Sequence, residues 1–238
     1  DFFDLRETIK HISIEGTHME EKDMWDLYRS LCTLHSWIQI IRTNDEEQHI
    51  KFPALEQVAE GVFTFYAVTK RIEQILDKYG HIKDEASADL FSIRRELQRT
   101  ESGISHTLHS ILRSAQAQGL VDKDVSPTIR DGRLVIPVAP AMKRRLRGIV
   151  HDESATGKTV YIEPADVVEA NNRIRELKAD ERREIIRILR DFAAMLRPNV
   201  KELLRGFAFL ADIEFIRAKA HFADRIQGIT PEISDAPV

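Results

Sequence analysis

The chain contains 238 residues, of which 42% are hydrophobic and 31% charged, and its formal net charge is −4. This length suffices for one or two domains with a hydrophobic core. No run approaches the roughly 20 apolar residues that a membrane span needs, and the first residues lack the pattern of a secretory signal. The single cysteine, Cys32, excludes an internal disulfide. We therefore expect a cytoplasmic protein without a membrane partner, and a start at Asp1 indicates a piece of a longer chain.

Four helices are predicted in the first third of the chain, where apolar residues recur every three or four positions. The second helix shows this spacing at Leu27, Leu31 and Leu34, and the polar run from Asn44 to His49 is expected to end it. The predicted ranges are 4–14, 19–43, 53–60 and 64–79.

A much longer helix is predicted from about Ser87 to Ala117. Four apolar residues in it, Leu90, Leu97, Ile104 and Ile111, are each seven positions apart. This spacing is typical of a helix that is paired along its length with another helix.

The period changes between residues 127 and 163, where the sequence favours strands. Asp131-Gly132 lies between two β-rich runs and suits a two-residue hairpin turn. Pro137 and Pro140 favour an edge position, and Gly157 is expected in a positive-φ turn. Further strands are predicted at 146–150 and 159–162.

A second long helix is predicted from Pro164 or Ala165, with Pro198 expected to kink or break it. The last helix, 206–224, is rich in Ala and Phe and is expected to be deeply buried. Each long helix would extend on the order of 45–50 Å.

We therefore predict a mainly α fold with a small β insertion, in which two long antiparallel helices carry a strand module between them. Residues 1–119 would form core helices and the first long helix, 120–164 the β-rich insertion, and 165–238 the return helix and further core helices.

Local charge indicates what the strand module binds. Between Pro127 and Glu163, seven cations accompany four acids, so this segment carries a net charge of +3 in an acidic chain. Clusters of Lys and Arg bind phosphates with a salt-sensitive affinity that does not depend on sequence. Aromatic residues do not interleave the cluster 143–147, so backbone contact is favoured over base stacking. The candidate nucleic-acid-binding residues are Arg133, Lys143, Arg144, Arg145, Arg147 and Lys158.

Other chemistry is disfavoured in this region. Ala155–Thr159 resembles half of a phosphate-binding loop, but Asp152 occupies the required glycine position and a strand follows instead of a helix. The adjacent residues His151, Asp152 and Glu153 cannot easily converge on one metal ion, and hydrogen bonds between local backbone groups and the side chains of Asp152 and Ser154 are the better interpretation. We expect no catalytic residue, cofactor or metal in this chain.

Two features at the start of the second long helix need an interpretation. Glu163 is interpreted as a residue near the positive end of the helix dipole. Asn171 and Asn172 are poor helix formers, and we hypothesise that they bond the backbone of the strand module and fix its angle to the helix.

The chain resembles the MutS family of mismatch-repair ATPases, and within it the second bacterial branch, which is linked to recombination suppression and ribosome rescue. The resemblance covers nearly all of the 238 residues and is strong in 84–178 and weak in 1–80. The segments that carry the resemblance are Asp84–Ser87 with Ile93–Leu97, Ile129–Val138, Gly148–Gly157, and Tyr161–Pro164 with Val167–Leu177.

The resemblance implies core and lever helices that carry a clamp closing over DNA. It also implies an ATPase domain, with its ATP and magnesium, and a small C-terminal nuclease domain, neither of which fits in the residues after Gly228. The fragment itself is therefore expected to have no enzymatic activity, and the full-length protein is expected to be a homodimer held largely by the ATPase part.

Three functions remain open from the sequence. The strand module would grip the backbone of branched or mismatched DNA, or it would engage ribosomal RNA on collided ribosomes, since the same cations serve either polymer. The third alternative is a structural coiled-coil module whose strands make protein contacts.

Overall fold

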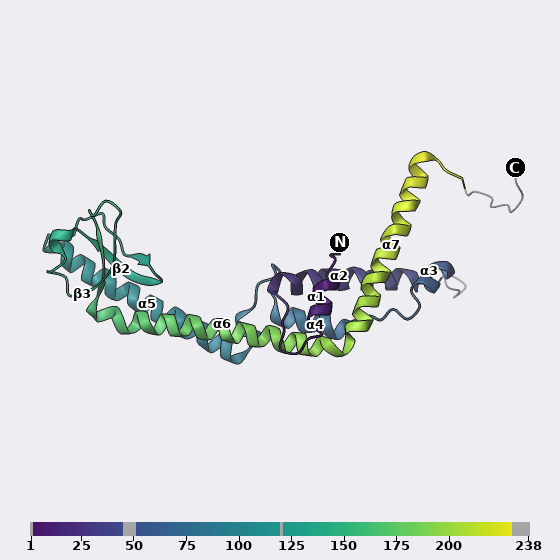
Figure 1. The fold of residues 1–238 in the computed structure, drawn as a ribbon, viewed down its shortest axis with the longest axis horizontal. Helices are drawn as coiled ribbons and strands as arrows, with labels where there is room; N and C mark the ends of the chain where they lie inside the picture. Colours follow the sequence, from purple (N-terminus) through teal and green to yellow (C-terminus); the bar gives the residue numbers. More distant parts are fainter. Residues whose placement is uncertain (1, 45–50, 120, 230–238) are drawn as a thin grey trace, which may run out of the picture. The chain divides into compact units, whose positions relative to one another are not determined.

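The computed structural model describes residues 2–44, 51–119 and 121–229, and the chain divides into two compact units. One unit comprises Asp1–Lys83 and Ile188–Val238 and is called the helical unit. The other comprises Asp84–Arg187 and is called the strand-bearing unit. Helix α6 (Val168–Leu196) contributes to both (Figure 1).

The helical unit confirms the four helices that periodicity predicted in the first third of the chain. The predicted ranges overrun the observed helices by up to four residues at an end, because end turns lack the repeated contacts that periodicity reports. Residues 45–49 of the polar run lie outside the described residues. The helices are α1 (Arg6–His11), α2 (Glu21–Ile41), α3 (Pro53–Val58) and α4 (Tyr66–Ile75), followed after α6 by α7 (Val200–Ile226).

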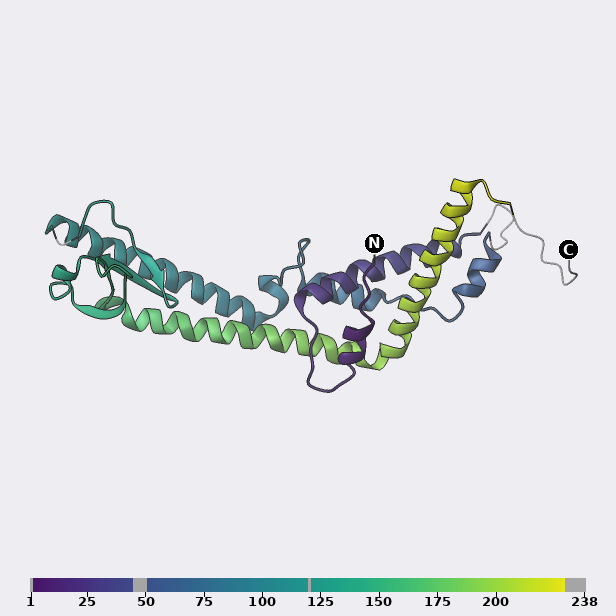
Figure 2. The ribbon, with the colours of Figure 1, turned by 45° about the horizontal axis from the view of Figure 1, so that its top comes forward.

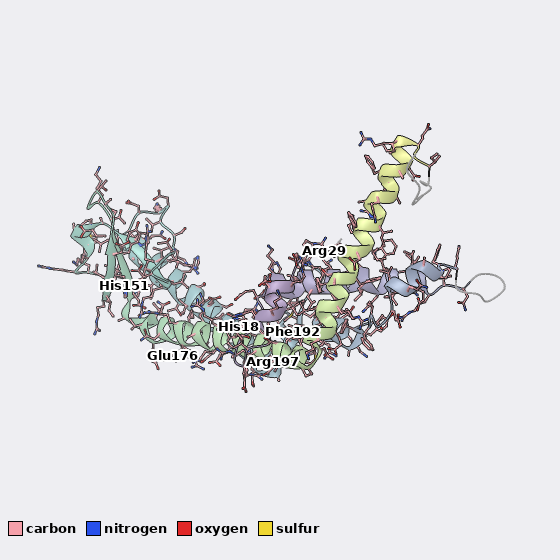
Figure 3. All side chains as sticks on the ribbon, turned by 45° about the vertical axis from the view of Figure 1, so that its right-hand side comes forward. His18, Arg29, His151, Glu176, Phe192 and Arg197 are labelled. Carbon is pink, nitrogen blue, oxygen red and sulfur yellow. The ribbon has the colours of Figure 1, made fainter. Side chains whose placement is uncertain are left out.

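The core of the helical unit forms where α2 contacts α4 and where α1 contacts α7. Ile9 of α1, Leu31 of α2 and Ile72 of α4 are fully buried or nearly so. Arg197 adds a polar contact, because its guanidinium donates hydrogen bonds to the carbonyl of Ile12 (2.9 Å) and to that of Thr17 (3.3 Å). Figure 3 shows Arg197 near Phe192, at the end of α6.

Pro198 has the effect expected from its missing N–H and its rigid ring. Helix α6 ends at Leu196, a 3-10 turn spans Arg197–Asn199, and α7 begins at Val200. The prediction of a deeply buried last helix was wrong for its second half. The buried side chains of α7 end at Ile213, whereas Phe215 is 64% exposed and Phe222 is also exposed. Composition alone does not show how far along the helix its neighbours extend.

His35 should make the helical unit sensitive to acid. Its Nε2 accepts a hydrogen bond from the Phe65 N–H (2.9 Å), and burial lowers the pKa of His35. A folded-state pKa below the unfolded value means that the fold favours neutral imidazole. This stability is fully present above about pH 6.5, the unfolded value, and is lost as the pH falls below it. We expect the melting temperature to fall from pH 7 to pH 5, and to fall less in His35→Gln; an unchanged pH dependence in that variant would contradict the role.

The strand-bearing unit contains α5, four strands and the first part of α6. The elements are α5 (Ala88–Ala117), β1 (Thr128–Arg130), β2 (Arg133–Val138), β3 (Gly148–Glu153), β4 (Val160–Pro164) and α6 from Val168 to Arg187. All paired strands are antiparallel, and their order in the sheet is β1-β2-β4-β3.

Helices α5 and α6 lie side by side in both ribbon views (Figures 1 and 2) and are bridged by polar side chains. Ser87, which caps α5, donates to Glu184 (2.5 Å), while Lys178 lies 3.2 Å from Glu101. Residue numbers thus rise along α5 while those of the bonded residues in α6 fall, so the two helices are antiparallel. Figure 3 labels Glu176, which lies on α6 two residues before Lys178.

The seven-residue seam of α5 serves two partners. Its second half, Ile104 and Ile111, joins a hydrophobic core with the strands, to which the neighbouring α5 residues Leu108 and Leu112 also contribute. The prediction that this seam faces another helix along its whole length was therefore wrong beyond about Ile104. Leucine and isoleucine at seven-residue spacing show which side of a helix is buried but not what covers it. Strand residues that complete this core include Ile136, Val138, Val160 and Ile162.

The hairpin prediction is confirmed, since Asp131 (φ 46°) and Gly132 (φ 73°) both have positive φ between the paired residues Arg130 and Arg133. Pro137 lies in β2, an inner strand, which differs from the predicted edge position. However, β1 pairs with β2 only as far as Val135, so Pro137 pairs with β4 alone and its missing N–H is tolerated.

Candidate nucleic-acid interface

Four candidate cations lie in the connection between β2 and β3. Because both strands are antiparallel to β4, they are parallel to each other, and residues 139–147 cross over β4. The predicted strand at 146–150 begins only at Gly148, because Leu146 and Met142 pack against the hydrophobic core from this connection. Their anchoring leaves the remaining long side chains in solvent. We call these exposed residues the crossover cations: Lys143, Arg144, Arg145 and Arg147.

Lys158 lies in the turn between β3 and β4. Gly157 has φ 65°, as predicted, and the turn is closed by a hydrogen bond from the Ser154 N–H to the Thr159 carbonyl (2.8 Å). The Ser154 hydroxyl oxygen also accepts from the Thr159 N–H (3.0 Å). Lys158 and Met142 line the same surface pocket, so this turn adjoins the crossover connection.

The crossover cations and Lys158 together form what we call the cationic surface. Among the residues that the structure describes, none of these five cations is within ion-pair distance of a carboxylate. Arg130 differs, because its guanidinium lies over the Tyr161 ring (4.2 Å to the centroid) and 3.8 Å from Asp152. Exposed cations without acidic partners suit the binding of external phosphates.

Arg133, the sixth candidate, occupies a different environment. Its side chain is only 14% exposed and lies 2.7 Å from the carboxylate of Glu163. It also donates a hydrogen bond to the Asn172 side chain (2.7 Å). Arg133 is thus engaged by partners within the unit, unlike the five exposed cations.

Glu163 is the centre of a buried polar network. The sequence was interpreted as placing Glu163 at the start of a helix, but the residue lies in β4. Its side chain is 0% exposed. Besides Arg133, its carboxylate contacts the Nε2 of His151 (2.5 Å) and accepts from the Asn171 amide (2.7 Å). Burying a carboxylate is costly unless charge and hydrogen bonds compensate it, and these partners provide both. We call Glu163, Arg133, His151, Asn171 and Asn172 the Glu163 network.

Sheet geometry brings the network together. Residues 133, 135 and 163 share one face of the sheet because side chains alternate along β2 and β4. The register of β3 shifts between Val150 and Asp152, so His151 is the extra residue of a β-bulge. Bulges re-aim a side chain, and this one places His151 beside Glu163. His151 appears on the strand-bearing unit in Figure 3.

Asn171 joins α6 to the sheet, as hypothesised from its poor helix propensity. Its side chain accepts from the Leu134 N–H (3.2 Å) and donates to the Leu134 carbonyl (3.1 Å). Asn172 instead bonds the side chain of Arg133. The hypothesis of backbone bonding is thus confirmed for Asn171 and wrong for Asn172.

The sequence did not reveal Glu163 as a buried partner. No local signal marked it, because Glu163 alternates with the core residue Ile162 along β4 and would be expected on the opposite, solvent-facing side of the sheet. No group of three or more His, Cys, Asp or Glu side chains within the described ranges could hold a metal ion. Likewise, none of the helices in those ranges is long and apolar enough to cross a membrane.

Comparison with known proteins connects this geometry to a family. No family model matches the chain. Endonuclease MutS2 of Geobacillus sp. strain WCH70 is 36% identical over 98% of the chain, and Endonuclease MutS2 of Levilactobacillus brevis is 37% identical over 98%. Endonuclease MutS2 of Shouchella clausii is 34% identical over 98%. The chain corresponds to a segment of a MutS2-type protein. It spans 29% of the length of each of these relatives.

The matches to these MutS2 relatives span 98% of the chain and are confined neither to the Glu163 network nor to the cationic surface. Every member of the Glu163 network lies within one of the motifs that first indicated the family, whereas Lys143–Arg147 lies between two of these motifs. The cationic surface is a separate observation with its own physical basis.

Proposed function

We propose that this MutS2-type segment grips the phosphate backbone of DNA with the cationic surface of its strand-bearing unit. The observation that carries the proposal is the exposure of five cations on two adjoining turns, without acidic partners among the described residues. Phosphate neutralisation by Lys and Arg supplies affinity without base recognition. The surface has no interleaved aromatic side chain in its sequence, so it favours backbone contact over base stacking.

The paired helices would then act as levers that carry this clamp. Their polar bridges and the buried attachment through Glu163 and Asn171 hold the strands to α6. In the full-length protein, an ATPase domain would move the levers through ATP and magnesium, and any nuclease activity would belong to residues outside this chain. The full-length protein would act as a homodimer.

The proposal predicts salt-sensitive binding of duplex DNA by the 238-residue chain. With five phosphate contacts or slightly fewer, the slope of log K against log salt should be about −3 to −5. Fluorescence anisotropy with branched and linear duplexes measures this slope. Co-sedimentation with ribosomes provides the comparison. Binding to ribosomes without measurable binding to duplex DNA would replace DNA by ribosomal RNA as the target, and binding to neither would contradict the proposal.

A further inference from the structure

The sheet of the strand-bearing unit has one edge that is open for pairing. Strands β1 and β3 are the edges, and β1 has only three residues, whereas β3 has six. An edge strand presents unpaired backbone N–H and C=O groups, and a short strand limits that exposure. The longer edge, β3, is therefore the better template for another strand.

The outward backbone groups of β3 can be assigned. The Arg147 carbonyl accepts from the Ala165 N–H (3.1 Å), so the groups of Arg147 point toward the β4 side. In an antiparallel ladder this direction alternates from residue to residue. Gly148 and Val150 consequently direct their N–H and C=O groups away from β4, and they are free to pair with an added strand.

Two side chains at the start of β3 are apolar although they are exposed to solvent. Ile149 is 48% exposed and Val150 is 37% exposed. These two residues offer nothing to a phosphate, although the crossover cations lie immediately before them. Adjacent exposed β-branched residues on an edge strand are suited to cross-strand packing.

Charges of opposite sign flank these apolar residues. Arg145 and Arg147 precede β3, while Asp152 and Glu153 end it, and all four side chains are exposed. Two such strands placed antiparallel bring the basic end of one beside the acidic end of the other. A parallel arrangement would bring like charges together, which is destabilising. The edge is thus complementary to itself in one orientation.

We propose that β3 pairs with β3 of a second copy of this chain in an antiparallel, two-fold arrangement centred on Ile149. Gly148 of each copy would exchange hydrogen bonds with Val150 of the other, and the two Ile149 side chains would pack together. Arg145 would lie near Glu153 of the second copy. The bulge at His151 falls outside the central three residues, so it does not interrupt them. A two-fold contact of this kind closes on itself.

The proposal does not rest on DNA binding, because it uses the apolar edge and its flanking charges. The contact is small, so it would be weak for isolated chains. It would become effective in an assembly that already holds two copies together, where the second contact is intramolecular. The two strand modules of such an assembly would then be joined.

Disulfide trapping in the absence of nucleic acid tests the pairing. Ile149→Cys in a Cys32→Ala chain would place two thiols opposite each other, at the Cα separation that a disulfide accepts. Diamide supplies the oxidant, taking up the two electrons and two protons that the thiols lose. Ile129→Cys in the same background is the matched control, since Ile129 is exposed on the opposite edge strand. We expect Ile149→Cys to form covalent dimers about ten-fold faster than the control, and equal rates would overturn the proposal.

Charge exchange distinguishes specific pairing from chance collision. Within the Ile149→Cys chain, Arg145→Glu or Glu153→Arg alone should slow the trapping, because each places like charges opposite one another. The double change restores opposite charges and should restore the rate. Failure of the double variant to recover would refute the antiparallel arrangement, even if the single variants were slow. Because DNA is absent, loss of trapping leaves the DNA-binding proposal untouched, and loss of DNA binding leaves the pairing proposal untouched.

Discussion

Replacing all four crossover cations by alanine is expected to lower the affinity of the chain for duplex DNA by about 10²–10³-fold near physiological salt. Each lost phosphate contact should also reduce the magnitude of the log–log salt slope by about 0.9. The change should affect all DNA sequences similarly, because backbone contacts carry no sequence information. Anisotropy titrations at several salt concentrations measure both quantities.

A control variant separates position from total charge. Arg95, Arg99, Arg175 and Arg182 are also exposed, but they lie on α5 and α6. Their joint replacement by alanine changes the net charge by the same amount as the crossover variant. The proposed interface predicts a much smaller loss of affinity and a nearly unchanged salt slope for this control. Equal losses in the two variants would mean that DNA responds only to the overall field of the molecule.

Local sequence signals predicted most helices of this fold and the hairpin between β1 and β2. The spacing of Leu27, Leu31 and Leu34 identified α2, and Pro198 marked the boundary between α6 and α7. Asp131-Gly132 identified the hairpin, since few dipeptides accept two successive positive φ angles. Each of these signals depends on residues that are close together in the chain.

The cation cluster was also visible in sequence, because four of five successive residues carry charge. The sequence did not show that Lys143 is exposed whereas Arg133 is paired with Glu163, because both are cations of the same segment. Arg133 differs because strand pairing brings it to Glu163, 30 residues away. Such non-local pairing is set by the sheet register, which single residues do not reveal. β3 was predicted two residues too early because Leu146 packs against the hydrophobic core from the connection before the strand.

Removing the carboxylate of Glu163 is expected to destabilise the strand-bearing unit by about 3–5 kcal/mol, because Glu163→Ala leaves the charge of Arg133 buried without its partner. Glu163→Gln keeps a carbonyl oxygen that can accept from Arg133 and Asn171, so its cost should be smaller, about 1–3 kcal/mol. A loss of 3–5 kcal/mol is a large part of the total stability of a domain. The strands should then detach from α6 while the helical unit remains folded.

Hydrogen exchange resolves this loss by segment, which a single melting curve cannot do for a chain with two units. In Glu163→Ala, the amide of Leu134, which is bonded to Asn171, and the amides of β4 should exchange much faster, whereas those of α2 should not change. Glu153→Ala is the matched control, because Glu153 is an exposed carboxylate in the same sheet and its removal should cost under about 0.5 kcal/mol. If the two variants exchange alike, the buried network does not hold the strands. If Glu163→Ala alone opens β2 and β4, the attachment of the strand module to α6 depends on one buried charge and its partners.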